Sequence, residues 1–168
     1  MSKYYLYLDV NRCIGCHACE VHCAAKHNLP LEVSLGKFII TGPRFIGEQP
    51  KMATRFLPCF HCEEAWCIAA CPTGAIQRRQ EDGIVLLDSD LCVGCKACIT
   101  ACPWKIPQWN PATQRVLKCD YCVDKIEAGE EPACVTGCTT GALHFGTPEE
   151  ATLHTVQSYA KGSLTQLL

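Results

Sequence analysis

The sequence predicts an α+β fold in which short β-hairpins and short helices surround groups of cysteines, with a longer helix at the C-terminal end. Three observations predict it. Sixteen of the 168 residues are cysteine, and they form four groups of four with none left over. The apolar runs between the groups are short and are bounded by turn residues, which is typical of hairpins. Residues 147–150, with the sequence Thr-Pro-Glu-Glu, carry the start signal of a helix.

The spacing of the cysteines indicates iron–sulfur chemistry. The first and third groups have the pattern C-x2-C-x2-C-x3-C, which is the bacterial pattern for 4Fe–4S clusters. The groups are Cys13, Cys16, Cys19 and Cys23; Cys59, Cys62, Cys67 and Cys71; Cys92, Cys95, Cys98 and Cys102; and Cys119, Cys122, Cys134 and Cys138. Four thiolates hold one cubane, so we expect four 4Fe–4S clusters, with iron bound through all sixteen cysteines.

The fourth cysteine of each group is expected to bind the cluster of another group. In ferredoxins with two clusters, the last cysteine of each motif ligates the other cluster. Here the rule pairs the second group with the third and the first with the fourth. The predicted sets are Cys13, Cys16, Cys19 and Cys138 for cluster one; Cys119, Cys122, Cys134 and Cys23 for cluster two; Cys59, Cys62, Cys67 and Cys102 for cluster three; and Cys92, Cys95, Cys98 and Cys71 for cluster four.

This pairing defines two nested units, so the predicted fold is a doubled bacterial ferredoxin. Residues 59–103 form the inner unit, and residues 1–58 and 104–146 form the outer unit. Residues 147–168 are the C-terminal helix and tail. An internal repeat supports this division, because Pro-Thr-Gly-Ala-Ile follows Cys71 and Thr-Thr-Gly-Ala-Leu follows Cys138.

The hairpins are predicted from β-prone runs on either side of turn residues. Residues 37–41 and 54–57 predict strands packed beside the clusters, with Gly-Pro at 42–43 as a breaker. Residues 72–87 predict a hairpin that turns at Glu-Asp-Gly, and residues 106–117 predict another that turns at Asn-Pro.

The C-terminal helix is predicted from its capping residues. Thr147 is the expected N-cap, Pro148 is the first helical residue, and Glu150 completes a capping box. We expect the helix to run to about Ala160 and to end at Gly-Ser, residues 162–163. Its apolar side either docks a partner or a neighbouring copy, or folds back on its own domain. The apolar residues concerned are Val156, Tyr159, Leu164, Leu167 and Leu168.

Composition excludes several classes of function. Lys and Arg number 15 against 17 Asp and Glu, a net charge of −2, which gives no case for nucleic-acid binding. No run of about 18 apolar residues is present, so no membrane span is expected. Neither a signal peptide nor a twin-arginine pair precedes Cys13, so we expect a cytoplasmic location. No set of residues suited to catalysis is found.

Several residues beside the cysteines have two interpretations. Three histidines either tune a cluster from outside its ligand shell or replace a ligand, and the complete thiolate sets favour the first: His17, His22 and His61. Three tryptophans are expected to shield clusters from water rather than to relay electrons: Trp66, Trp104 and Trp109. Three cations either offset the negative charge of reduced clusters or are solvated: Arg12, Lys96 and Lys118. Gly15 and Gly94 allow backbone N–H groups to approach the clusters, or simply form tight turns.

The chain resembles the four-cluster iron–sulfur subunits of molybdenum and tungsten oxidoreductases. The resemblance covers about residues 3–146 and rests on the three upstream motifs together with Cys-Asp-Tyr-Cys at 119–122, Gly129, Pro-Ala-Cys-Val at 132–135, and Cys138. It implies a non-catalytic subunit that relays single electrons between a molybdenum or tungsten catalytic subunit and a flavin, hydrogenase or other redox partner. One departure is Ala65-Trp66, where many relatives have proline before the third cysteine of the second motif.

The compact form of the chain resembles tungsten aldehyde oxidoreductase or soluble formate dehydrogenase small subunits. That resemblance implies that copies of the chain can stack into filaments. Two alternatives come from other classes of protein. A free polyferredoxin would diffuse between enzymes, and a zinc-stabilised module would use the same cysteines without sulfide.

Overall fold

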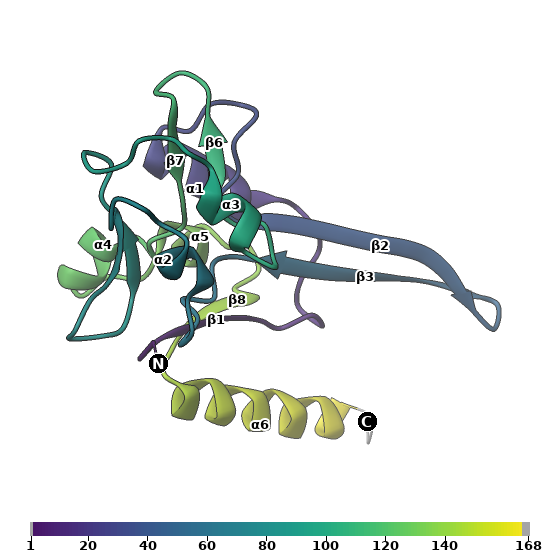
Figure 1. Ribbon diagram of the computed structural model, residues 1–168. Helices are drawn as coiled ribbons and strands as arrows, with labels where there is room; N and C mark the ends of the chain where they lie inside the picture. The colour runs from purple at the N-terminus through teal and green to yellow at the C-terminus, as the bar shows by residue number, and fades with distance from the viewer. Residues whose placement is uncertain (1, 166–168) are drawn as a thin grey trace.

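The computed structural model describes residues 2–165 of the chain. Within these residues, four separate two-stranded antiparallel sheets alternate with helices, most of them short. Figure 1 shows a body that contains most elements, a long hairpin arm that projects from it, and a C-terminal helix along one side.

The elements are β1 (Tyr5–Leu8), α1 (Ala18–His27), β2 (Lys37–Ile46), β3 (Gln49–Leu57), α2 (Trp66–Ala69), β4 (Ile76–Arg78), β5 (Val85–Leu87), α3 (Ala97–Ala101), β6 (Gln108–Asn110), β7 (Arg115–Leu117), α4 (Val123–Glu127), α5 (Ala133–Thr136), β8 (Leu143–Gly146) and α6 (Pro148–Thr165).

Two of the predicted hairpins are confirmed. Strand β4 pairs with β5, with Ile76 opposite Leu87, and β6 pairs with β7, with Trp109 opposite Val116. The inward residues of both hairpins pack together, because Ile76, Val85 and Val116 form one buried cluster with Cys98. The hairpins therefore help to position a cysteine-bearing segment.

Strand β1 was not predicted, and it joins the two ends of the predicted outer unit. It pairs with β8, with Leu6 opposite Phe145. Matching hydrogen bonds follow in the two halves of the molecule. The N–H of Asp9 donates to the carbonyl of Ala142 at 2.8 Å, and the N–H of Asp88 donates to the carbonyl of Ala75 at 2.7 Å. Sheets β1–β8 and β4–β5 thus lead into the first and third cysteine motifs in the same way.

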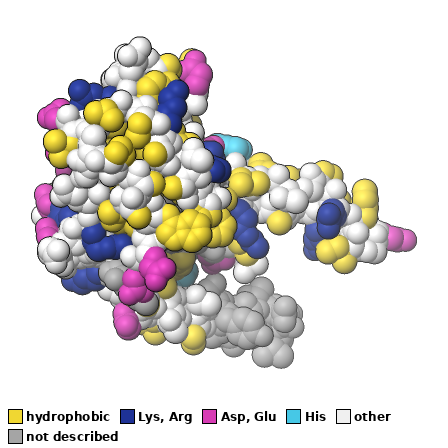
Figure 2. Space-filling view, viewed as in Figure 1, with side chains coloured by type: hydrophobic (Ala, Val, Ile, Leu, Met, Phe, Trp, Pro, Cys, Tyr) yellow, Lys and Arg dark blue, Asp and Glu magenta, His cyan; other side chains and the backbone are white. Residues whose placement is uncertain are grey.

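The β2–β3 hairpin is longer than predicted. Residues Gly42-Pro43 do not break β2, because the strand bulges there, between Thr41 and Arg44, and the ladder then continues to Ile46. A bulge accommodates a proline that cannot donate to the ladder. Only the base of this arm packs against the body, through buried Phe56, and residues 39–53 are exposed. The segments predicted to pack beside the clusters, residues 37–41 and 54–57, form this base, and the hairpin beyond them projects from the body (Figure 1; Figure 2).

Helix α6 starts as predicted and ends later. The N–H of Thr147 donates to Glu150 Oε2 at 2.7 Å, and the N–H of Glu150 donates to Thr147 Oγ1 at 3.4 Å, which is the expected capping box. The predicted end at residues 162–163 is wrong, because one glycine costs only about 1 kcal/mol inside a helix and the helix reaches Thr165.

The first half of α6 lies against the β1–β8 sheet. The ring of His154 packs against two rings of this sheet. Its centre lies 3.8 Å from the centre of the His144 ring and 5.8 Å from that of the Tyr7 ring. Val156 is exposed. The rest of the expected apolar side falls outside the described part of the chain: Leu167, Leu168, and the side chains of Tyr159 and Leu164. Among the described residues, no helix has the length and apolar character needed to cross a bilayer.

Candidate iron–sulfur sites

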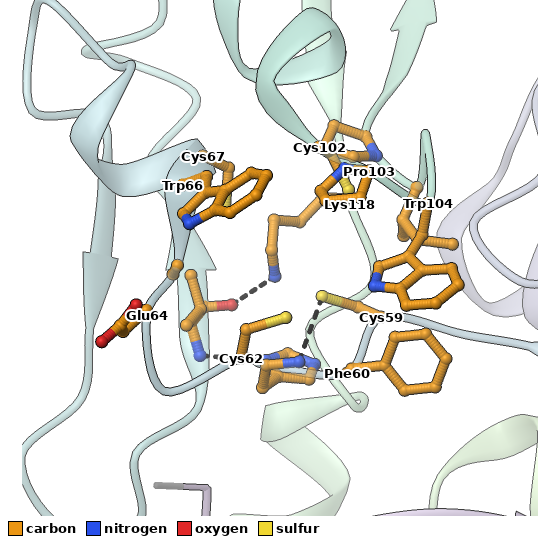
Figure 3. A pocket seen from close by; sticks show the side chains of 15 residues that line it. Cys59, Phe60, Cys62, Glu64, Trp66, Cys67, Cys102, Pro103, Trp104 and Lys118 are labelled. Atoms are coloured by element: carbon orange, nitrogen blue, oxygen red, sulfur yellow. Dashed lines mark hydrogen bonds between the residues drawn. The ribbon is translucent and has the colours of Figure 1, made fainter.

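One cavity is lined by the four cysteines of the predicted cluster-three set. It has a volume of about 320 Å³ and lies between residues 59–67 and residues 102–107. The four cysteines are Cys59, Cys62, Cys67 and Cys102. Figure 3 shows the sulfur atoms of Cys59 and Cys62 directed toward the middle of the cavity, with the ammonium group of Lys118 reaching into the same space. An all-thiol donor set of this kind fits a 4Fe–4S cluster.

A second cavity is lined by the predicted cluster-four set, Cys71, Cys92, Cys95 and Cys98. Gly94, with φ +69°, and Lys96, with φ +63°, flank Cys95, so the loop wraps tightly before α3 begins. Lys96 Nζ lies 3.9 Å from the centre of the Trp109 ring, which closes one side of the loop.

Members of the predicted outer sets are also brought together, as pairs of thiols from distant parts of the chain. Cys19 and Cys138 are close enough that the charge of Cys138 contributes to the raised pKa of Cys19. Cys122 acts on the pKa of Cys23 in the same way. Cys16 Sγ lies 3.8 Å from Thr139 Oγ1, beside Cys138.

Half of the sixteen thiols have a raised pKa and are poor acids before metal binds. Burial raises the pKa of Cys19 and Cys23 to about 12 and that of Cys98 to about 11. Burial also raises the pKa values of Cys119 and Cys134. Iron binds thiolates, so cluster assembly at these positions must release protons.

Cys71 and Cys138 differ from the other thiols. Burial raises the pKa of Cys138, but N–H donors of residues 140, 142 and 143 outweigh it, and the pKa lies below its usual value. The N–H groups of Ala142 and Leu143 lie 3.2 and 3.4 Å from Cys138 Sγ. The pKa of Cys71 is likewise lowered, against burial, by hydrogen bonds from the Thr73 hydroxyl and from backbone N–H groups. The repeated Thr-Gly-Ala therefore builds the same sulfur-binding turn twice, a role that the sequence alone did not reveal.

The three histidines singled out from the sequence lie in different environments. His61 is 1% exposed, and its Nδ1 accepts the N–H of Val85 at 2.9 Å, which leaves the proton on Nε2. Burial, with the charges of Lys118 and Arg78, holds the pKa of His61 well below its usual value. His17 is exposed and bonds Glu20 at 2.7 Å. His22 is exposed beside Gly137.

His27 is a neighbour of the cluster-two cysteines that was missed. Its Nε2 lies 3.5 Å from Cys122 Sγ and 3.6 Å from Asp120 Oδ1. The signal was present, because His27 follows Cys23 by four residues and α1 therefore places both side chains on one face.

The tryptophans and cations divide by exposure. Trp66 and Trp104 line the cluster-three cavity but are 58% and 53% exposed, so they form its rim and leave it open to water. Arg12 and Lys96 are exposed, and Arg12 donates to the carbonyl of Thr140 at 2.6 Å. Lys118 is only 6% exposed, which rules out the solvated interpretation for this residue.

Two family models, both described as a 4Fe-4S dicluster domain, match the chain over residues 52–148 and 12–75. The electron transfer subunit of Salmonella typhi thiosulfate reductase is 41% identical over 156 residues, which cover 89% of this chain and 79% of that protein. The B subunit of the anaerobic dimethyl sulfoxide reductase of Escherichia coli is 36% identical, and the match covers 89% of this chain and 76% of that protein.

The iron-sulfur subunit of the nitrate-inducible formate dehydrogenase of Escherichia coli is 37% identical over 158 residues. The match covers 85% of this chain and 54% of that protein, so the chain spans about half the length of this relative.

The two motif glycines allow a matched test of loop packing. Gly15 and Gly94 share φ +69°, but a side chain at Gly94 would collide with the Gln114 carbonyl, whereas one at Gly15 would make ordinary contact with Ile40 at 3.7 Å. We expect Gly15→Ala to cost about 1–2 kcal/mol from backbone strain, and Gly94→Ala to cost about 1–3 kcal/mol more from overpacking. The loss of stability in each variant is measured by the guanidinium concentration at which half of the visible absorption of the clusters is lost. Equal midpoints for the two variants would contradict the predicted collision.

Proposed function

The chain belongs to the 4Fe-4S dicluster-domain family that includes the iron–sulfur electron-transfer subunits of oxidoreductase complexes, and we propose that it relays single electrons through four 4Fe–4S clusters between a catalytic subunit and a second redox partner. The observation that carries this proposal is the composition of the two cavities. Each is lined by three cysteines of one motif and the last cysteine of the other, as cross-ligation requires. The chain passes from β1 into the first motif and from β5 into the third motif with matching hydrogen bonds, made by Asp9 and Asp88. This similarity supports the same arrangement in the outer unit.

Each bound cluster supplies a site that takes up and gives back one electron. The chain holds such a site with four thiolates, stabilises the sulfur of Cys71 and Cys138 by backbone N–H groups, and keeps apolar side chains around it. N–H donors to sulfur raise the reduction potential of a cluster. Both residues belong to sets that cross between motifs, so the two turns act on clusters four and one.

The exposure of the cysteines supports a relay with more than one entry point. Cys16, Cys62 and Cys95 are exposed, whereas Cys122, at the same position in the fourth motif, is buried. Three sites therefore reach the surface, and the cluster-two site is internal. A chain that only stored electrons would need one such opening, whereas a relay between two partners needs at least two.

The partners proposed are a catalytic subunit that carries a molybdenum or tungsten cofactor, of the formate dehydrogenase or aldehyde oxidoreductase type, and a flavin or hydrogenase subunit. The first is supported by the relatives, which are named as subunits of formate dehydrogenase, thiosulfate reductase and dimethyl sulfoxide reductase. A freely diffusing polyferredoxin is the second candidate. The net charge of −2 provides little electrostatic steering for encounters of that kind.

Metal and sulfide analysis tests the number and type of clusters. Four cubanes predict about sixteen iron and sixteen acid-labile sulfide per chain, with broad visible absorption that bleaches on reduction. Analysis of anaerobically purified protein provides the measurement. A zinc content of about four per chain without sulfide would rule out electron transfer as the function.

Isolation of the native chain tests the subunit role. We expect it to elute from a sizing column with a second, larger chain that contains molybdenum or tungsten, because the relay requires a catalytic partner. Iron content and metal analysis of the same fractions provide the measurement. Elution of the fully loaded chain by itself from a gentle anaerobic lysate would favour the polyferredoxin.

Serine substitutions test the crossed ligation. Cys138→Ser should alter the same electron paramagnetic resonance signal as Cys16→Ser, because both residues are assigned to cluster one. Cys134→Ser is the matched control, because it lies four residues away and should instead alter the signal that Cys122→Ser alters. If Cys138→Ser shares its signal with Cys122→Ser, the proposed pairing is wrong.

A further inference from the structure

Lys118 carries a buried charge that has no counter-ion among the described residues. Its ammonium group donates to the carbonyl oxygens of Cys119, at 2.7 Å, and of Val85. Its side chain is 6% exposed. No ion pair involving Lys118 is formed within residues 2–165. A buried ammonium held only by carbonyl dipoles is costly, so its environment must offer negative charge.

The structure indicates where that negative charge belongs. The ammonium of Lys118 lines the cavity of the cluster-three cysteines (Figure 3). The backbone of the next residue, Cys119, leads directly into the cluster-two set. Four thiolates around an iron–sulfur cubane give a net negative charge, and reduction adds one more. Lys118 thus faces a cavity whose expected contents would compensate its charge.

We propose that Lys118 is a positioned counter-charge that raises the reduction potential of the cluster held by Cys59, Cys62, Cys67 and Cys102, with a weaker effect on the neighbouring cluster-two site. The electron that arrives adds one negative charge, which the ammonium offsets without uptake of a proton. Because Lys118 is buried, water and salt screen its charge less than they would screen the same charge at the surface. The inference rests on the cluster binding proposed above. It goes further by assigning the residue whose charge sets the reduction potential of one cluster apart from those of the others.

Lys96 provides a matched comparison within the same chain. It also lines a cysteine cavity, that of the cluster-four set, and its Nζ lies 3.9 Å from the centre of the Trp109 ring. Unlike Lys118 it is exposed, so water and salt screen its charge. The two lysines therefore differ in burial, which is the property on which the inference depends.

Redox titration monitored by electron paramagnetic resonance tests the proposal. The variants are Lys118→Met, which removes the charge at similar length, Lys118→Arg, which keeps it, and Lys96→Met as the control. The cluster-three signal is identified as the one altered by Cys62→Ser. Iron and sulfide content, measured on every sample, tests cluster binding separately from the role of Lys118.

We expect Lys118→Met to retain its clusters and to lower the reduced-to-oxidised ratio of cluster three at a fixed potential by at least tenfold, about 59 mV for one electron. Lys118→Arg should stay near the native value, and Lys96→Met should move cluster four by less. An unchanged cluster-three midpoint in fully loaded Lys118→Met would overturn the proposal. If Lys118→Met loses cluster three, its retention by Lys118→Arg supports the counter-charge, whereas loss from both variants shows a packing role and refutes it.

Discussion

The fold depends on the convergence of thiols that are far apart in the chain. Cys19 meets Cys138, and Cys23 meets Cys122, although each pair is separated by most of the sequence. Apart from the β1–β8 sheet and the apolar residues around it, few elements could hold these segments, because most helices have only four or five residues and the sheets have only two strands each. Such elements are marginal alone. The groups of apolar side chains that form the hydrophobic core themselves contain cysteines. The same residues therefore supply both the proposed iron ligands and part of the core.

The need to bring several sulfur atoms to one point also shapes the backbone of the cysteine loops. The residues before α1, α3 and α4 adopt left-handed conformations, although they are His17, Lys96 and Cys122 rather than glycine. A left-handed residue of this kind costs about 1–2 kcal/mol, and the loop keeps it because the neighbouring cysteines must face the same point. The turn after Cys71 and the turn after Cys138 follow the same logic, with N–H groups directed at sulfur.

Spacing made the inner cysteine sets predictable, because three thiols of one motif lie close together in the sequence and the ferredoxin rule adds the last thiol of the partner motif, as the lining of the two cavities shows. The β4–β5 and β6–β7 hairpins were equally local, since each has its turn residues beside its strands. Strand β1 was missed because its partner β8 lies at the other end of the chain, and four residues carry too little pattern to reveal a distant pairing. The burial of Lys118 was also out of reach. A lysine beside a cysteine motif is usually solvated, and only the approach of Val85 and the residue 102–107 segment makes it an interior charge.

The arm formed by β2 and β3 has a consequence for how the molecule meets other chains. A two-stranded ribbon has two open edges, each with unpaired backbone donors and acceptors that another strand can join. Along this arm, residues 37–57, positive charge exceeds negative charge, and the apolar side chains of Phe45 and Ile46 are exposed (Figure 2). The cations are Lys37, Arg44, Lys51 and Arg55, and the single acid is Glu48. Like charges on facing ribbons repel each other and so oppose edge-to-edge pairing. Salt weakens that repulsion but not the attraction between apolar side chains. Low ionic strength is therefore the condition under which the isolated chain best resists association through its arm.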